Sequence, residues 1–322
     1  MSCKSLGEYY HLDGKHLQHQ YKKHLSNYHN WSQKDHAKEW VLFAKNFGRH
    51  LSIDETSLSN GELYTIVTNK AAKGKKGCLV AMIKGTESSN IIKILHKIPW
   101  EKRCSVKEIT LDMAASMNKV VRRCFPKAVV VIDRFHVQKL ANDAVQELRI
   151  DYRWKAIDKE NKAIKYAKTK GVAYQNTLLA NGDTLRQLLV RSRFLLFKSP
   201  YKWSDSQRFR ASILFEKYPK LKKAYDLSQA LKNIFSRTKD KGVAYAKLAK
   251  WYDQVEKTGM KSFRIVSNSI KTHYIGILNY FENRSTNASA ESFNAKIKAF
   301  RTAFRGVREI EFFLFRLSKI YA

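Results

Sequence analysis

The stretch 129–136, V-V-V-I-D-R-F-H, restricts the fold of this chain more than any other feature. Four consecutive β-branched residues are typical of a strand buried on both faces, because a strand with one wet face alternates apolar and polar side chains. Asp133 ends the run, and His136 follows at a predicted helix start. Open α/β sheets bind ligands at the carboxyl ends of their strands. The alternative is an Asp that caps a helix above a packed His.

Two earlier strand candidates also end in an acid. In 50–56, H-L-S-I-D-E-T, apolar residues alternate with polar ones and Asp54 lies near the end. In 106–113 the alternation is less regular, and Asp112 closes the run. Three strands that each deliver a carboxylate are much harder to explain by chance than any one of them. This recurrence predicts a shared site.

The elements around these acids predict an α/β fold. The first three predicted strands form an antiparallel meander with Asn60-Gly61 as the hairpin turn after the first: 50–56, 63–68 and 78–83. Helices then alternate with the strands that end at Asp112 and Asp133, which favours parallel addition to the meander. We therefore expect a mixed five-stranded sheet in the order of a ribonuclease H-like core.

The charge of the chain points to a polyanionic partner. Lys and Arg number 61 against 28 Asp and Glu, which gives a net charge of +33. Repulsion among so many positive charges destabilises the folded state unless a polyanion binds close by. Nucleic acid is therefore the leading candidate for a partner. An anionic membrane surface is the alternative, although no segment shows the apolar face of an interfacial helix.

Targeting signals and metal-binding cysteine motifs are not visible. The amino terminus has no apolar signal region, and no apolar run reaches the roughly 18 residues that a membrane span needs. We therefore expect a cytoplasmic, nucleoid-associated protein. The four cysteines have no C-x-x-C pairing and no metal-ligand spacing with histidine, which argues against a structural zinc site.

The sequence predicts four segments. They are a basic helical N-terminal segment (1–48), the first part of the core (49–136), an all-helical insertion after the fifth strand (137–272) and C-terminal helices that complete the core (273–322). In the N-terminal segment, Trp40, Phe43 and Phe47 lie on one stripe of a predicted helix. In the insertion no strand is predicted, and residues 204–207 fit a capping box.

Residues 287–306 predict a helix with two chemically different faces. The buried face is apolar: Phe293, Ile297, Phe300 and Phe304. The other face leads with an acid and continues with amide and cationic residues: Glu291, Asn294, Lys298, Arg301 and Arg305. One acid before a column of cations suits a metal-bound phosphate with a nucleic-acid backbone running past it. The alternative is a solvated face with helical ion pairs.

Phosphodiester cleavage by two divalent ions requires a set of carboxylates of this kind. The ions must be held about 3.5–4 Å apart, one near the attacking oxygen and one near the leaving oxygen. Such hard cations prefer oxygen ligands. Two Asp on neighbouring strand ends and a Glu from a helix that crosses that sheet edge would supply them.

These residues together resemble a known family. The motifs are I-D-E at Asp54, L-D-M at Asp112, F-P-K-A-V-V-V-I-D-R-F-H-V at 125–137 and N-x-x-x-E-x-x-N-x-x-I-K at 287–298. In this order they resemble the DDE transposases of bacterial insertion sequences, and more narrowly the subgroup with a D-x-F-H-V signature. The resemblance extends from near Arg49 to the end of the chain.

The resemblance implies a ribonuclease H-like catalytic domain that cuts element ends and joins them to target DNA. Asp54, Asp112 and Glu291 would hold two Mg²⁺ ions, for which Mn²⁺ can substitute. Strand order favours Asp112 over Asp133 as the second Asp, and the choice stays open at this point. The supporting residues would be Asp133, His136 and Asn294. The residues expected to contact double-stranded DNA, at the element ends and the target, are Lys296, Lys298, Arg301 and Arg305.

The sequence departs from the family in two ways. Ser292 follows Glu291 where family members commonly have Gly. Members also begin with a zinc-binding and helix-turn-helix region, which we expect on a separately encoded polypeptide that joins a homo-oligomer of this chain on DNA. Two alternatives remain: a non-catalytic DNA-binding protein derived from a decayed or truncated transposase, and a nuclease without a joining step.

Overall fold

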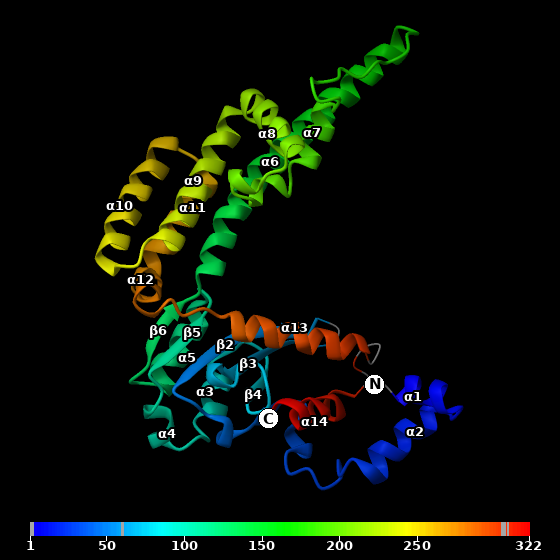
Figure 1. Ribbon diagram of the computed structural model, residues 1–322, viewed down its shortest axis with the longest axis vertical. Helices are drawn as coiled ribbons and strands as arrows, with labels where there is room; N and C mark the ends of the chain where they lie inside the picture. The colour runs from blue at the N-terminus through cyan, green and yellow to red at the C-terminus, as the bar shows by residue number, and fades with distance from the viewer. Residues whose placement is uncertain (1–2, 59–60, 304–306, 308) are drawn as a thin grey trace. The chain divides into compact units, whose positions relative to one another are not determined.

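The computed structural model describes residues 3–58, 61–303, 307 and 309–322. These residues form two compact units (Figure 1). The sheet unit comprises Met1–Asp133 and Asn283–Ala322, and the helical unit comprises Arg134–Glu282. The helical unit thus begins at Arg134, against the predicted 137, and ends at Glu282, against the predicted 272.

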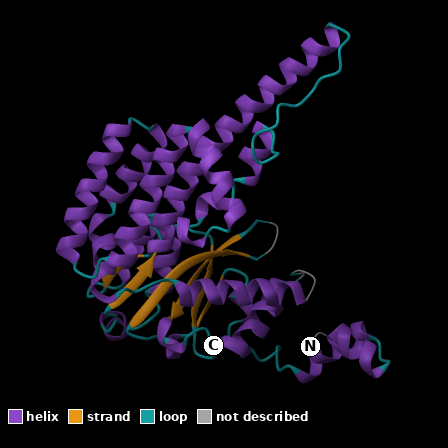
Figure 2. Ribbon diagram, turned by 45° about the horizontal axis from the view of Figure 1, so that its top comes forward, coloured by secondary structure: helices purple, strands orange, loops and turns teal. Residues whose placement is uncertain are grey.

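The sheet unit contains a mixed sheet, whose strands are orange in Figure 2. Its six strands are in the order β1-β4-β3-β2-β5-β6. The strands are β1 (Trp40–Leu42), β2 (His50–Ser57), β3 (Leu63–Asn69), β4 (Leu79–Lys84), β5 (Glu108–Leu111) and β6 (Val129–Ile132). β2, β3 and β4 form the predicted antiparallel meander, and β5 and β6 add to β2 in parallel. The α/β class and all five predicted strands are confirmed.

The predicted strand number and the predicted helical stripe at Trp40, Phe43 and Phe47 were wrong. Trp40–Leu42 is the sixth strand, and it pairs with the edge strand β4 through Trp40 opposite Ile83. Val41 is fully buried while its two neighbours are half-buried, which is the alternation of a strand. The pairing partner lies far away in sequence, so spacing within one short segment could not reveal it.

The helices of the sheet unit come from both ends of the chain and from the strand connections. They are α1 (Cys3–Tyr10), α2 (Gly14–Gln20), α3 (Ser88–Leu95), α4 (Trp100–Cys104), α5 (Ala115–Cys124), α13 (Ala288–Ala303) and α14 (Ile310–Tyr321). The predicted turn at Asn60-Gly61 falls partly outside the described residues. Gly61 itself has a φ of 81°, a left-handed conformation that glycine adopts without steric cost.

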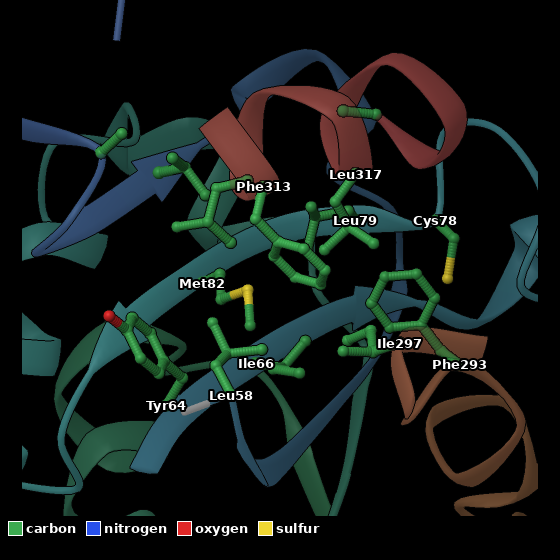
Figure 3. Close-up of a cluster of buried hydrophobic side chains, with 14 residues drawn as sticks. Leu58, Tyr64, Ile66, Cys78, Leu79, Met82, Phe293, Ile297, Phe313 and Leu317 are labelled. Atoms are coloured by element: carbon green, nitrogen blue, oxygen red, sulfur yellow. The ribbon is translucent and has the colours of Figure 1, made fainter. Parts of the chain in front are cut away.

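Apolar burial holds α13 and α14 on one face of the sheet (Figure 3). Phe293 and Ile297 of α13 are 0% and 1% exposed, and they share a core cluster with Ile66 of β3 and Met82 of β4. Phe313, Leu314 and Leu317 of α14 complete it. Burying each large side chain contributes about 1.5–3 kcal/mol. This cluster fixes the apolar face of α13, so its opposite, polar face is set as well.

The helical unit consists of helices joined by turns and loops. They are α6 (Arg134–Thr169), α7 (Leu185–Arg191), α8 (Asp205–Lys217), α9 (Pro219–Arg237), α10 (Lys241–Thr258), α11 (Lys261–Thr272) and α12 (Tyr274–Asn283), the last ending at the unit boundary. α6 packs against α7, α9 and α11. The predicted capping box at Ser204 is confirmed. Among the described residues no helix is long and apolar enough to cross a membrane.

A buried ion pair makes the helical unit sensitive to acid. The side chain of Asp183 is fully buried and accepts hydrogen bonds from Arg191 and, at 2.9 Å, from Arg210. Burial would raise the pKa of Asp183, but the two guanidinium groups lower it below its ordinary value. The pair therefore stabilises the fold above the unfolded pKa of about 3.9. This contribution is lost as the pH falls through the folded pKa.

We predict that Asp183→Asn lowers the free energy of unfolding by about 1–3 kcal/mol at pH 7, because both arginines lose a charged partner. Below pH 4 the difference from the native protein should shrink. Urea unfolding followed by circular dichroism measures both. Asp226→Asn is the control, since Asp226 forms an exposed pair with Lys222 and should cost less than about 0.5 kcal/mol. Equal losses in the two variants would contradict the prediction.

Candidate active site

Three acids lie in one row across three parallel, neighbouring strands, β2, β5 and β6. Asp112 and Asp133 directly follow β5 and β6, and Asp54 lies within β2, three residues before its end. The pairs nearest these acids are Ser52 with Thr110 and Leu111 with Ile132. Continued along the strands, this register places Asp54 opposite Asp112, and Asp112 opposite Asp133. Neighbouring strands are about 4.8 Å apart, so the three residues form a compact acid row.

The acid row lies on the face of the sheet that α13 covers. Asp54 pairs with Ile66 of β3, so both side chains point to the same face, and Ile66 packs against α13. Asn294 of α13 donates a hydrogen bond from Nδ2 to Oδ2 of Asp54 at 2.7 Å. The backbone N–H of Glu55 donates to the other oxygen, Oδ1, at 2.8 Å. These two bonds fix the orientation of the Asp54 carboxylate.

Glu291 reaches the opposite end of the row. A carboxylate oxygen of Glu291 lies within 4.8 Å of one of Asp133. Asp133 is only 2% exposed, whereas Glu291 is exposed in the first turn of α13. Since Glu291 and Asn294 are one helical turn apart, α13 crosses the row from Asp133 to Asp54. Two carboxylates this close repel each other, and a cation between them relieves the repulsion.

Asp112 occupies the centre of the row. Its Oδ1 accepts a hydrogen bond at 2.8 Å from the backbone N–H of Ala114, in the turn that leads to α5. The neighbouring Glu55 reports the local potential: burial, Asp112 and Asp54, in that order, raise the pKa of Glu55. Several carboxylates thus lie close together here, in a chain whose net charge is +33. Such a group of carboxylates attracts cations.

The donor set suits a hard divalent ion. The groups at the row are carboxylate oxygens. Asn287 lies one helical turn before Glu291. The Asn287 side chain is fully buried, and neither its amide oxygen nor its amide nitrogen bonds to any described residue. Its backbone oxygen accepts from Glu291 N at 2.9 Å. Carboxylate oxygens favour hard ions such as Mg²⁺ or Mn²⁺ over softer metals.

The predicted DNA-contacting residues of α13 differ in their surroundings. Lys296 donates to the backbone oxygen of Gly74 at 2.7 Å, and Arg301 donates to that of Leu58 at 2.9 Å. Both side chains thus hold α13 to the loops that follow β2 and β3. Lys298 is exposed. Arg305 lies outside the described residues, together with Phe304 and Gly306 of the predicted helix.

The structure places His136 in the first turn of α6, which belongs to the helical unit. Its supporting role stays a prediction. Two further polar residues adjoin predicted ligands and were given no role from the sequence. Glu55 directly follows Asp54, and Asn287 precedes Glu291 by one helical turn.

Comparison with known proteins gives consistent matches. A family model described as a transposase, of the ISL3 type of DDE transposases, matches residues 51–317, which include the acid row and Glu291. The transposase for insertion sequence element IS1001 of Bordetella parapertussis is 22% identical over 272 residues, 83% of this chain and 60% of the relative. The transposase for IS1557 of Mycobacterium tuberculosis, in strains CDC 1551 / Oshkosh and H37Rv, is 24% identical over 253 residues, 78% of this chain and 55% of the relative.

The chain therefore spans little more than half the length of the curated relatives that it matches. No solved structure matches the chain significantly.

Proposed function

The chain belongs to the ISL3-type family of transposases, and from this membership we propose that it cuts DNA at the ends of an insertion sequence and joins them to target DNA. The observation that carries the proposal is the acid row of Asp54, Asp112 and Asp133 with Glu291 of α13 across it. Double-stranded DNA is the proposed substrate, in keeping with the net charge of +33.

We further propose that the sheet is a ribonuclease H-like core with one added strand. Without β1, the strand order β4-β3-β2-β5-β6 has the meander first and the two parallel strands beside its first member. β1 then extends the meander at its outer edge. This interpretation places Asp54 on the first strand of the core and Asp112 after the fourth.

In the proposed mechanism Asp54, Asp112 and Glu291 would hold two Mg²⁺ ions, with Mn²⁺ as a substitute. When bound, such ions activate the attacking oxygen and stabilise charge on the leaving oxygen. Asn294 keeps the Asp54 carboxylate in one orientation through its 2.7 Å hydrogen bond. Lys298, exposed on the same helix, would neutralise a backbone phosphate beside the site.

The proposal predicts two products that form only with a divalent ion. A supercoiled plasmid that carries the DNA flanking this gene should be nicked at the element ends, and the freed ends should then be joined to a second DNA. Mg²⁺ and Mn²⁺ should support both steps, and EDTA should stop both. Gel electrophoresis and sequencing of junctions identify the products.

The alternatives give different outcomes in the same experiment. A nuclease without a joining step would leave nicks and no junctions. A non-catalytic binding protein would shift the DNA in a native gel and leave it uncut in either metal. Either outcome would overturn the proposed function.

A further inference from the structure

A second charged group lies on β5 behind the acid row. Glu108 precedes Asp112 by four residues, and it is 4% exposed. Lys70, in the 3-10 turn η4 (Lys70–Ala72) after β3, donates to Oε1 of Glu108 at 3.2 Å and to Oγ1 of Thr110 at 2.7 Å. An ammonium group of η4 and a carboxylate of β5 are thus paired.

The segment that leads into α13, residues 283–287, also bonds to Glu108. Ser285 donates a hydrogen bond to Oε1 of Glu108 and accepts one from Lys70. Asn283 donates from Nδ2 to Oε2 of Glu108 at 3.5 Å. Both oxygens of one buried carboxylate therefore hold the same short stretch of chain.

The backbone of this stretch is itself constrained. Arg284, between the two residues that bond to Glu108, has a φ of 53°. A residue with a Cβ rarely adopts this left-handed conformation, and it persists only where the surroundings impose it. Here the bonds on both sides of Arg284 impose it, so the path of the chain toward α13 is set at this point.

We infer that Lys70, Glu108 and Ser285, here called the Glu108 anchor, are positioning residues that set the location of Glu291 over the acid row. Only six positions separate Ser285 from Glu291, and the backbone bond from Glu291 N to Asn287 O lies within this interval. Phe293 and Ile297 fix the middle of α13, and the anchor fixes its start. The inference rests on the proposed function, since it concerns the Glu of that site.

Stabilisation of the fold explains the Glu108 anchor less well than positioning of Glu291 does. A buried ion pair is often no more stabilising than apolar residues of the same volume, because both charges lose their hydration. Burial alone would raise the pKa of Glu108, but the bonds from Ser285 and Lys70 lower it. The carboxylate is therefore charged at neutral pH and holds both partners. This geometry joins three separate segments at the entry to the helix that carries Glu291.

The test is Ser285→Ala in the full chain, with Ser105→Ala, at an exposed serine after α4, as the matched control. We expect the Mn²⁺ concentration for half-maximal DNA cleavage to rise roughly 10- to 100-fold in Ser285→Ala. Ser285→Thr keeps the hydroxyl and should restore the native value. Ser105→Ala should leave it unchanged.

A second measurement does not depend on activity. Hydrogen exchange of the amides of residues 287–294 should become faster in Ser285→Ala, while the core amides of β3 keep their native rates. Lys70→Met alone would leave the buried Glu108 carboxylate without its cation, and the protein can unfold. The second variant therefore combines Lys70→Met with Glu108→Gln. It should show the same local increase in exchange as Ser285→Ala.

Unchanged hydrogen-exchange rates of residues 287–294 in both variants would overturn the inference. Faster exchange spread evenly over the sheet unit would also overturn it, because such a change indicates general destabilisation. Failure of the proposed function is distinguishable from either. In that case the native protein cuts no DNA in Mn²⁺, whereas the exchange measurement still shows whether the anchor fixes the start of α13.

Discussion

Asp54→Ala and Glu291→Ala should each abolish divalent-dependent DNA cleavage, with losses of roughly 10³-fold or more. Each change removes one of the carboxylates proposed to hold the metals, and the several kcal/mol of charge stabilisation that metals supply in the transition state would be lost with it. DNA binding should stay close to native, because it depends mainly on cations that contact phosphates. Nicking assays and filter binding on the same preparations separate the two effects.

Thermal unfolding adds a readout that needs no DNA. An ion that binds only the folded protein stabilises it by about 1.4 kcal/mol at ten times its Kd. Mn²⁺ should therefore stabilise the native protein and the control Glu101→Ala, at an exposed acid of α4, but not Asp54→Ala or Glu291→Ala. Near-normal cleavage by either site variant would remove that residue from the proposed site.

The acid row could be predicted from sequence because Asp112 and Asp133 directly follow strands and Asp54 lies three residues before the end of β2. The unbroken β-branched run before Asp133 and the alternation before Asp54 are local signals, and the parallel order of the strands brings their ends together. Asn294 could be assigned to the site from a local pattern, since one helical turn separates it from Glu291. Its partner, Asp54, is 240 positions away in the sequence and is known only from the structure.

Features made by distant segments could not be predicted in the same way. Trp40 lies in a strand because it pairs with β4, opposite Ile83. No residue near Trp40 in the sequence specifies this pairing. The Glu108 anchor joins residues from η4, β5 and the segment after α12. Its one local signal is the even spacing between Glu108 and Asp112, which places both side chains on the same face of a strand.

The choice between Asp112 and Asp133 as second metal ligand can now be argued from position. Asp112 lies between Asp54 and Asp133 in the acid row, so it is a neighbour of both ends of the site. Asp133 is buried at the far end, within 4.8 Å of Glu291 and two strands away from Asp54. Two ions about 3.5–4 Å apart need a carboxylate that both can share, and the central position suits that role.

We therefore expect Asp112→Ala to be as inactive as Asp54→Ala, whereas Asp133→Ala should lose roughly 10- to 100-fold, as is usual for residues that orient metal ligands. Cysteine variants make the test direct, because a thiolate ligand tolerates Mn²⁺ better than the harder Mg²⁺. Asp112→Cys should be inactive in Mg²⁺ and partly restored in Mn²⁺, and Asp133→Cys should keep the same reduced activity in both metals. If Mn²⁺ instead restores Asp133→Cys, and Asp112→Cys stays active in Mg²⁺, then Asp133 is the ligand and Asp112 holds the turn into α5.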